Sequence, residues 1–350
     1  MLPPVATQHK ALFLESENGP YIVKNVKTSD PGPGEVLVKV EAASLNPVDW
    51  KIHNFIKEFP LPIGCDSAGV VAQVGEGVTR VQVGDRVAHQ GGYAVRIATF
   101  QEYTIIDEEL VVKIPDSMSF DQAASIPVAV AAPAIGLYGD KVPLGGAGLI
   151  APWQHGGHTE YAKKPILVMG GASSVGQYAI QFATISRFSP IITTVSPENK
   201  DLAASTGATH TLGRSLSPST LADAVVAITS DPITVVFDAI STPETQEAAY
   251  KILAPGGTLV VVQDEAIKTK QDDKKVVRVI ASGHIPANAR FAKDLYAHLG
   301  DALASGEIKP CEVEILPGGL NGVAEGLERL KNGTVRAKKL VIRPPETSDL

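Results

Sequence analysis

The chain has 350 residues, of which 44% are hydrophobic and 20% are charged, and this composition and length predict a soluble protein with two domains. Its formal net charge of −7 leaves no excess of positive charge for binding nucleic acid or an anionic membrane. Its two cysteines, Cys65 and Cys311, are too few for a structural four-cysteine zinc site and fit a reducing compartment.

Residues 1–125 are expected to form short strands separated by turns. The N-terminal segment lacks the charged and apolar regions of a secretory signal. Residues 35–41 alternate between apolar and polar types, as in a half-buried strand. A second apolar run at residues 67–74 and a third segment at residues 78–87 follow, each bounded by glycine-containing turns. This spacing predicts a barrel-like β domain.

Residues 126–285 are expected to form an α/β domain, and residues 286–350 return to the first domain. Apolar strands and helices alternate here, which indicates βαβ units and a parallel sheet; the strands are expected at residues 166–169, 191–195, 234–237 and 257–262, and the helices at 174–186, 197–207 and 243–253. A final strand is expected at residues 339–342. The glycine- and proline-rich segment 139–165 is a long loop of the kind that is usually functional or mobile.

No window of the sequence approaches 18 uninterrupted apolar residues, so we expect no membrane-spanning segment. Together with the missing secretory signal, this predicts a cytoplasmic protein.

A turn rich in glycine and serine joins the first strand of the α/β domain to its first helix, which is the context of a dinucleotide-binding site. At such a turn the backbone N–H groups of the helix start can face a pyrophosphate. Gly171 is expected to permit the tight turn and Gly176 the close packing of helix on strand. Ser173 replaces the middle glycine of the usual pattern, and its hydroxyl can donate to phosphate. An ordinary loop is the alternative, but the βαβ series favours a cofactor site built from Gly171, Ala172, Ser173, Ser174, Val175 and Gly176.

The end of the second strand of this domain indicates which dinucleotide binds. NAD sites usually place an acidic residue there for the ribose 2′-hydroxyl, whereas this strand ends in Ser196, with Lys200 one helical turn later. A hydroxyl and a cation suit a 2′-phosphate, which predicts NADPH, although Glu198 adds a negative charge nearby. The alternative is that Ser196 only caps a helix. Residues at the ends of the next two strands are candidates for the nicotinamide-ribose wall, although ordinary strand-end loops would look similar: Ala239, Ile240 and Val261.

With these segments the chain resembles the medium-chain dehydrogenase/reductase superfamily over nearly its whole length; the segments are residues 34–40, 46–51, 69–75, 83–87, 170–176 and 253–257. The resemblance implies an α/β fold class, in which a GroES-like β-barrel catalytic domain is interrupted by a Rossmann domain with a doubly wound parallel sheet. Zinc-bearing members carry a cysteine where this chain has Asn46, and Gly-His-Glu where it has Gly64-Cys65-Asp66. A catalytic zinc needs three protein ligands, so we expect no metal.

Within the superfamily, residues 46–51 and 194–199 look like those of the zinc-independent quinone and enoyl reductases, and of the fungal trans-acting enoyl reductases of polyketide synthesis in particular. The resemblance implies that Asn46, Asp49 and Lys51 order the nicotinamide and the substrate, with Lys51 a candidate proton donor. Tyr138, at the start of the long loop, is a second candidate donor. The alternatives are an exposed Asp49–Lys51 ion pair, which would contribute little, and a packing role for Tyr138.

The expected chemistry follows from the expectation that no zinc ion is bound to act as a Lewis acid. Without one, oxidising an alcohol is harder than reducing an activated C=C bond, because the substrate carbonyl delocalises the charge that the hydride brings. We therefore expect an NADPH-dependent reductase of α,β-unsaturated carbonyls or enoyl thioesters, a small-molecule substrate and, by resemblance, a polyketide synthase partner. A quinone reductase and a non-catalytic NADPH-binding accessory protein are the alternatives. His155, His158 and Glu160, in the long loop, suit a lid or cleft rim better than a metal site, with Trp153 touching substrate.

Overall fold

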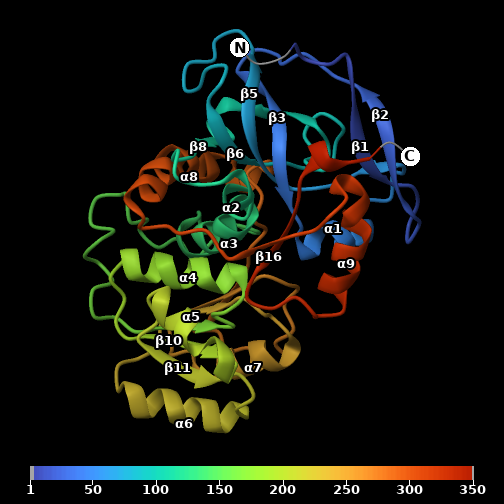
Figure 1. Cartoon of the computed structure of the whole chain (residues 1–350). Coiled ribbons are helices and arrows are strands. Elements are labelled where there is room, and N and C mark those ends of the chain that lie inside the picture. Colours follow the sequence, from blue (N-terminus) through green and yellow to red (C-terminus); the bar gives the residue numbers. More distant parts are fainter. Residues whose placement is uncertain (1–3, 349–350) are drawn as a thin grey trace. The chain divides into compact units, whose positions relative to one another are not determined.

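The computed structural model of the chain describes residues 4–348 and divides into two compact units (Figure 1). We call the first the β unit (Met1–Val128 and Tyr296–Leu350) and the second the α/β unit (Ala129–Leu295). The second boundary between the units, after Leu295, lies inside the helix α8 (Pro286–Ser305). The sequence predicted this boundary after residue 285, just before the helix begins. The expected α/β fold class, with one part built on β sheets and one of alternating strands and helices, is confirmed by these units.

The β unit contains two sheets. One has the order β15-β16-β3-β5-β6-β8, with β7 also paired to β3, and the other has the order β2-β1-β4. The strands are β1 (Gln8–Leu14), β2 (Tyr21–Lys27), β3 (Glu35–Ser44), β4 (Leu61–Pro62), β5 (Asp66–Val74), β6 (Arg86–Gln90), β7 (Tyr103–Asp107), β8 (Val111–Lys113), β15 (Val313–Ile315) and β16 (Lys339–Ile342). The C-terminal β16 pairs antiparallel with β3, so that Val341 lies opposite Ser44. The last part of the chain thus completes the sheet that its first part begins.

Short helices close the β unit around an apolar core. They are α1 (Pro47–Lys51), α2 (Phe120–Ala124) and α9 (Val323–Lys331), with 3-10 turns at Ile52–Asn54, Glu108–Leu110, Gly319–Gly322 and Pro344–Glu346. Leu45, Leu327 and Leu340, from the end of β3, from α9 and from β16, are completely or almost completely buried in one cluster. Each such side chain contributes about 1.5–3 kcal/mol on burial, which holds α9 and the C-terminal strand against the end of β3.

The α/β unit is built on a six-stranded sheet with the order β11-β10-β9-β12-β13-β14, in which every neighbouring pair is parallel. Its strands are β9 (Ile166–Met169), β10 (Ile191–Val195), β11 (His210–Gly213), β12 (Val235–Asp238), β13 (Thr258–Val261) and β14 (Lys275–Arg278). In chain order this is the 3-2-1-4-5-6 arrangement of a dinucleotide-binding sheet. The order reverses between β9 and β12, and ligands of such sheets bind beyond the carboxyl ends of the strands at this point.

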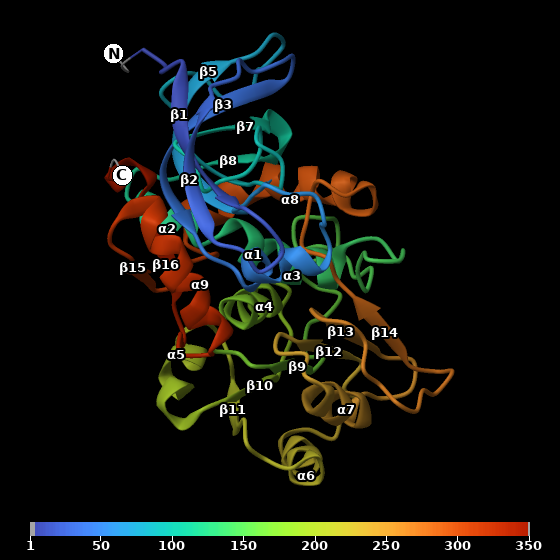
Figure 2. The ribbon, with the colours of Figure 1, turned by 90° about the vertical axis from the view of Figure 1, so that its right-hand side faces the viewer.

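Helices cover both faces of this sheet. They are α3 (Pro127–Tyr138), α4 (Ser174–Ile185), α5 (Lys200–Ser205), α6 (Pro218–Ile228) and α7 (Pro243–Ile252), with a 3-10 turn at Pro197–Asn199. Figure 2 shows α4 on one face and α6 and α7 on the other. The strands β11 and β14 and the helix α6 were not predicted from the sequence. The two strands lie at the sheet edges, each with one exposed residue and three half-buried ones, and they therefore lack the continuous apolar run that marks a central strand.

The segment 139–165 is packed against the α/β unit by aromatic contacts. Trp153 Nε1 donates to Asp294 Oδ2 at 2.7 Å, and its ring lies 5.9 Å from that of Phe291. Tyr161 stacks on Phe188 with ring centroids 4.9 Å apart. A role of the segment as a lid stays a prediction.

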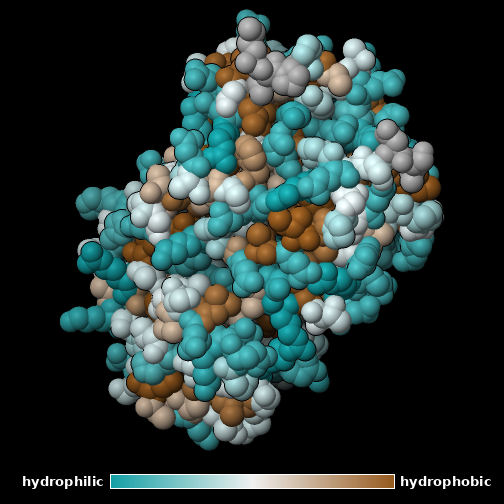
Figure 3. Space-filling view, viewed as in Figure 1, coloured by the Kyte–Doolittle hydropathy of each residue, from teal (hydrophilic) through white to brown (hydrophobic). Residues whose placement is uncertain are grey.

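By length and composition alone, the span Phe120–Tyr138 could cross a membrane, which was not expected from the sequence. However, 78% of its apolar window is buried inside the protein, and the core helix of a soluble protein passes the same test. Figure 3 shows a face on which hydrophilic residues predominate and hydrophobic ones form small separate groups. Hydrophobic residues that are scattered in this way are normal on a protein surface.

Candidate functional site

The turn between β9 and α4 has the backbone geometry of an anion-binding loop. Gly170 has a φ of 76°, in the left-handed region that glycine adopts readily, so Gly170, and not Gly171 as expected, makes the tight turn. Gly171 is needed for a different reason, because a Cβ there would lie 2.2 Å from Thr193 Oγ1. At Gly176 a Cβ would lie 2.2 Å from the carbonyl oxygen of Gly170. The prediction that Gly176 permits close packing of the helix is therefore confirmed.

The hydroxyl of Ser173 is used within the turn. It donates to the carbonyl oxygen of Gly170 at 2.8 Å and accepts from the N–H of Gly176 at 3.1 Å, which caps α4. The expectation that this hydroxyl donates to phosphate is wrong, because its one hydrogen is already engaged. The N–H groups of Ser174 and Val175, in the first turn of α4, have no partner within the helix, and such groups can hold a pyrophosphate.

The carboxyl end of β10 carries two exposed cations. Ser196 is buried, and its hydroxyl accepts from Asn199 Nδ2 at 2.9 Å. Lys200 is exposed at the start of α5. Arg214 is also exposed, and its N–H donates to the carbonyl oxygen of Val195 at 2.9 Å, which places it beside the same strand end. Arg214 escaped the sequence analysis because the short edge strand before it was not foreseen.

The carboxyl end of β12 meets the glycine-serine turn. A Cβ at Gly170 would lie 2.4 Å from Ile240 Cδ1, so Ile240 covers this turn. The N–H of Ala239 donates to the carbonyl oxygen of Met169 at 3.1 Å. The structure therefore brings these two predicted residues to the turn. Val261 is different, because its side chain is completely buried in the hydrophobic core; the expectation that it lines the cofactor site is wrong for the side chain.

Asp238 organises this strand end. Its carboxylate accepts from the N–H groups of Ile240 at 3.0 Å and Ser241 at 2.8 Å, and from Thr245 Oγ1 at 2.7 Å. Burial raises the pKa of Asp238, and these three donors oppose the rise. The carboxylate thus fixes the loop that presents Ile240.

The structure contradicts the assignment of Tyr138 as a proton donor. Its hydroxyl is buried inside the α/β unit, 2.6 Å from Ser186 Oγ and within 3.2 Å of the carbonyl oxygen of Phe182, to which it donates. Burial raises the pKa of Tyr138 well above its usual value, and the contact with Ser186 opposes the rise only in part. The packing alternative describes this residue correctly.

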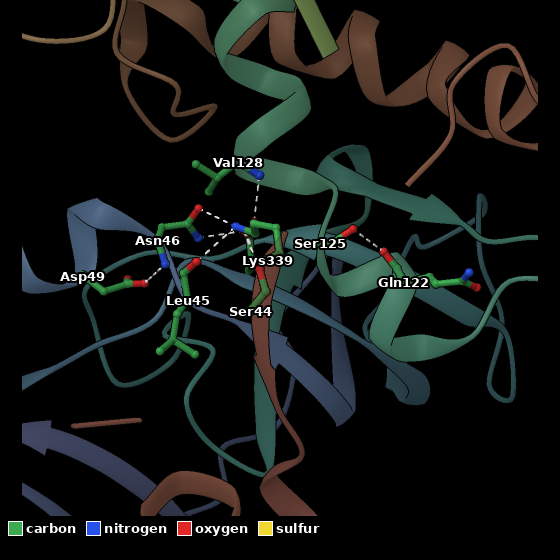
Figure 4. A network of polar contacts seen from close by, with 9 residues as sticks. Ser44, Leu45, Asn46, Asp49, Gln122, Ser125, Val128 and Lys339 are labelled. Carbon is green, nitrogen blue, oxygen red and sulfur yellow. Dashed lines mark hydrogen bonds and ion pairs between the residues drawn. The ribbon is translucent and has the colours of Figure 1, made fainter. Parts of the chain in front are cut away.

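In the β unit, the ends of three neighbouring strands form a buried polar cluster (Figure 4). β16 begins at Lys339, β3 ends at Ser44 and β5 begins at Asp66. Because β3 lies between the other two strands, these residues converge just before Asn46, the residue that precedes α1.

Four donors surround the Asp66 carboxylate. Its Oδ2 accepts from Ser44 Oγ at 2.9 Å, from Asn46 Nδ2 at 2.7 Å and from Lys339 Nζ at 3.0 Å. Its Oδ1 accepts from the N–H of Val128 at 2.7 Å, in the first turn of α3, where a negative charge is favoured. Lys339 Nζ also donates to Asn46 Oδ1 at 2.6 Å and to the carbonyl oxygen of Leu45 at 3.2 Å. The carboxylate and the ammonium thus form an almost completely buried ion pair.

Asp49 lies beside this cluster and is completely buried. Its Oδ2 accepts from the N–H of Asn46 at 2.7 Å, whereas its Oδ1 has no hydrogen bond among the described residues. Burial raises the pKa of Asp49 to about 7, and the charge of Asp66 adds to this rise. The N–H of Asn46, the Lys339 ammonium and the Cys65 thiol oppose the rise. Asp49 is therefore partly protonated at neutral pH.

Cys65 lies beside Asp49, and Lys51 follows it at the end of α1. Burial, and then the negative charge of Asp49, raise the pKa of the Cys65 thiol well above its usual value, so the thiol stays protonated. Lys51 is half-buried with its Nζ 5.2 Å from the centre of the Trp50 ring, and partial burial lowers the pKa of Lys51. The alternative of an exposed Asp49–Lys51 ion pair is wrong, because Asp49 is not exposed. Lys51 as a proton donor stays a prediction.

Comparison with known proteins places this geometry in a family. Residues 32–116 match the alcohol dehydrogenase GroES-like domain, and residues 174–281 match the zinc-binding dehydrogenase family. The trans-enoyl reductase grgB of a Penicillium species is 32% identical over 96% of this chain and 98% of its own length. The chain belongs to the enoyl reductases of the medium-chain dehydrogenase/reductase superfamily. The protein is thus an oxidoreductase with a nicotinamide cofactor.

Further relatives support this placement. The trans-enoyl reductase himH of Aspergillus japonicus is 35% identical to this reductase over 88% of the chain and 89% of its own length. Among solved structures, a Pseudomonas syringae quinone oxidoreductase is 26% identical with a TM-score of 0.73, covering 95% of this chain and 99% of its own. The CurK enoyl reductase, at 19% identity and a TM-score of 0.76 over 97% and 99% of the two chains, shares the fold.

The zinc in the name of the second matching family does not fit the donors of this reductase. Both oxygens of Asp66 are occupied, and an ammonium already lies 3.0 Å from one of them, where it would repel a second cation. Asn46 Oδ1 accepts from the same ammonium, so it is not directed at a site for a metal ion. Within residues 4–348 no group of three His, Cys, Asp or Glu side chains could hold a metal ion.

Lys339 and Asp66 were missed as members of the site. The sequence indicated a strand at residues 339–342, but nothing in it separates Lys339 from its neighbour Lys338. Lys338 is half-buried and lies 3.4 Å from Glu314, whereas Lys339 is buried. Only the register of the final strand decides which of the two lysines enters the cluster.

Proposed function

We propose that this reductase uses NADPH to reduce the activated C=C bond of an α,β-unsaturated carbonyl compound, including an enoyl thioester, without zinc. The observation that carries the proposal is the ammonium–carboxylate–amide cluster of Lys339, Asp66 and Asn46, in which hydrogen-bond donors fill the region where a metal would need ligands. Relatives that are named trans-enoyl reductases along nearly the whole chain support the same reaction.

The chemistry requires a hydride and a stabilised negative charge. NADPH, when bound, would supply the hydride. Addition of the hydride at the β-carbon of the substrate would turn the conjugated carbonyl into an enolate, whose negative charge lies largely on the oxygen. Asn46 Nδ2 carries two hydrogens, one of which is donated to Asp66. The second can donate to the developing enolate oxygen, as hydrogen-bond donors do in other enzymes that stabilise such a charge. A proton delivered to the α-carbon by water or by Lys51 completes the reduction.

The proposed preference for NADPH over NADH rests on the residues at the carboxyl end of β10. The N–H groups of Ser174 and Val175 are available to the pyrophosphate. Lys200 and Arg214 are both exposed beside the end of β10, and two cations suit the 2′-phosphate that distinguishes NADPH from NADH. Ser196 stands where NAD sites usually have an acidic residue, so the 2′-phosphate meets no carboxylate at that position.

The proposed protein partner of this reductase is a polyketide synthase. By sequence resemblance, the enoyl group belongs to an intermediate of a polyketide synthase that works in the cytoplasm. A quinone reductase is the second candidate, favoured by the 26% identity to the Pseudomonas syringae quinone oxidoreductase.

Oxidation of NADPH and of NADH, followed with a small enone, an enoyl thioester and a quinone, tests the proposal. We expect NADPH oxidation with the enone or the thioester, unchanged by a chelator, and slower oxidation of NADH. Turnover of the quinone alone would establish the second candidate instead. Binding of NADPH without turnover of any of the three would support the accessory-protein alternative.

A further inference from the structure

The buried ammonium of Lys339 has its hydrogen-bonding capacity filled. The residue is only 5% exposed, and its Nζ donates to the carbonyl oxygen of Leu45, to Asn46 Oδ1 and to Asp66 Oδ2. An ammonium has three N–H donors and no acceptor, so these contacts use all of them. Lys339 therefore has no N–H left for a substrate or a cofactor.

These contacts determine how the Asn46 amide is turned. Lys339 can only donate, so it selects the amide oxygen, and the Asp66 carboxylate can only accept, so it selects the amide nitrogen. A flipped amide would set its NH₂ group against the ammonium and its oxygen against the carboxylate. One orientation is thus favoured by two charged partners at 2.6 Å and 2.7 Å. In this orientation, the second N–H of Asn46 has a fixed direction.

We propose that Lys339 is a positioning residue, which with Asp66 locks the Asn46 amide so that its remaining N–H is presented to the substrate carbonyl. This role rests on the proposed function of Asn46 as a donor to the enolate oxygen. It assigns to the C-terminal strand a part in the reaction, although Lys339 itself contacts no reacting atom.

Stability alone gives a poor account of this cluster. The desolvation of a buried ion pair often exceeds the attraction between its charges, and replacing the pair with apolar residues of similar volume is often neutral or stabilising. Asp66 already has donors from Ser44 and Val128. What Lys339 adds to these donors is a charged hydrogen-bond donor for the amide oxygen of Asn46.

A double-mutant cycle tests whether Lys339 acts through Asn46. Lys339→Met removes the charge and keeps the approximate length of the side chain. We expect kcat for enone or enoyl thioester reduction to fall roughly tenfold to hundredfold, because misplacing a single transition-state donor has effects of this size. The Kd for NADPH should not change. In the Asn46→Ala background the same substitution should lower kcat by less than about twofold. Equal effects in both backgrounds would mean that Lys339 does not act through Asn46.

Two further variants separate positioning from folding. Lys339→Met leaves Asp66 buried without its counter-ion, which is destabilising, and Asp66→Asn in the same chain removes that charge. We expect this double variant to regain stability while kcat stays low, because neither partner then selects the amide orientation. Recovery of kcat together with stability would show a structural role only. Lys338→Met, at the neighbouring half-buried lysine that pairs with Glu314, is the matched control and should leave kcat unchanged.

A measurement without turnover separates this proposal from the proposed function. In ¹H–¹⁵N spectra, the signals that are absent from Asn46→Ala identify the Asn46 amide. We expect two well-separated, slowly exchanging N–H signals in the native protein, and shifted or broadened ones in Lys339→Met. Unchanged signals would overturn the positioning role, whatever the activity. If these signals change as expected but the native protein reduces no enone or thioester, the proposed function fails while the control of Asn46 by Lys339 stands.

Discussion

Lys339 Nζ lies 3.0 Å from Asp66 Oδ2, although 273 positions of the sequence separate the two residues. Both are buried, and both lie at the ends of strands that flank β3 in one sheet. The polar centre of the β unit therefore forms only when the last part of the chain has joined the sheet. Assembly of this site therefore requires the C-terminal strand.

The first prediction concerns this pair. Asp66→Asn should lower the free energy of unfolding by about 3–5 kcal/mol, because it leaves the Lys339 ammonium buried without a counter-ion. Adding Lys339→Met should recover more than half of the loss, since the double variant buries no charge. Urea unfolding followed by circular dichroism measures both values. Additive losses would contradict the buried-pair argument.

The parts of the site that the sequence predicted are those that local geometry determines. A strand, a glycine-serine turn and a helix start can be recognised together, because the cap at Ser173 and the close approach at Gly176 depend on residues within a few positions of each other. Lys339 could not be assigned in this way. Its contact with Asn46 spans 293 positions, and a shift of one residue in β16 would place Lys338 there instead.

The wrong expectations have physical reasons of the same kind. Tyr138 stands at the start of a loop, but the sequence does not show that its hydroxyl turns inward to Ser186. Val261 ends a central strand of a parallel sheet, which is buried on both faces, and its side chain lies in the core. Arg214 was missed because an edge strand of mixed exposure precedes it.

The second prediction tests the two cations at the end of β10. Lys200→Ala and Arg214→Ala should each weaken NADPH binding by roughly ten- to a hundredfold, since each removes a charged partner of the 2′-phosphate. NADH, which lacks this phosphate, should bind as before. Fluorescence titration with both cofactors measures the difference, with Lys251→Ala, an exposed lysine in the last turn of α7, as the control. Equal weakening of NADPH and NADH would remove this assignment.

The third prediction compares two residues of the glycine-serine turn. Ser173→Ala removes the cap of α4 and should lower the free energy of unfolding by about 0.5–2 kcal/mol. NADPH affinity should fall by less than about threefold, because the hydroxyl donates to Gly170 and not outward. Gly176→Ala should abolish NADPH binding, since its Cβ would lie 2.2 Å from a backbone oxygen. A large loss of affinity in Ser173→Ala would show that the hydroxyl reaches the cofactor.

The fourth prediction follows from the pKa of Asp49, which burial raises to about 7 from an unfolded value near 3.9. Between these two values the folded protein holds a proton that the unfolded chain has released. Stability from this group is therefore fully present below pH 4 and is lost as the pH rises towards 7. Asp49→Asn, which cannot ionise, should become more stable relative to the native protein as the pH rises from 5 to 7. Urea unfolding of both proteins at several pH values gives this difference, and a constant difference would contradict the raised pKa.

The fifth prediction concerns Tyr138, whose hydroxyl lies 2.6 Å from Ser186 Oγ in the interior of the α/β unit. Tyr138→Phe should change kcat by less than about twofold, because no proton can be released from a buried hydroxyl with a raised pKa. It should lower the free energy of unfolding by about 0.5–1.5 kcal/mol, the usual contribution of one hydrogen bond. Ser186→Ala should have a similar effect, and the double variant should lose less than the sum of both, because the two side chains share one contact. If kcat instead fell by two orders of magnitude in Tyr138→Phe at unchanged stability, the tyrosine would have to act in the reaction, and the interior position of its hydroxyl could not be the one that functions.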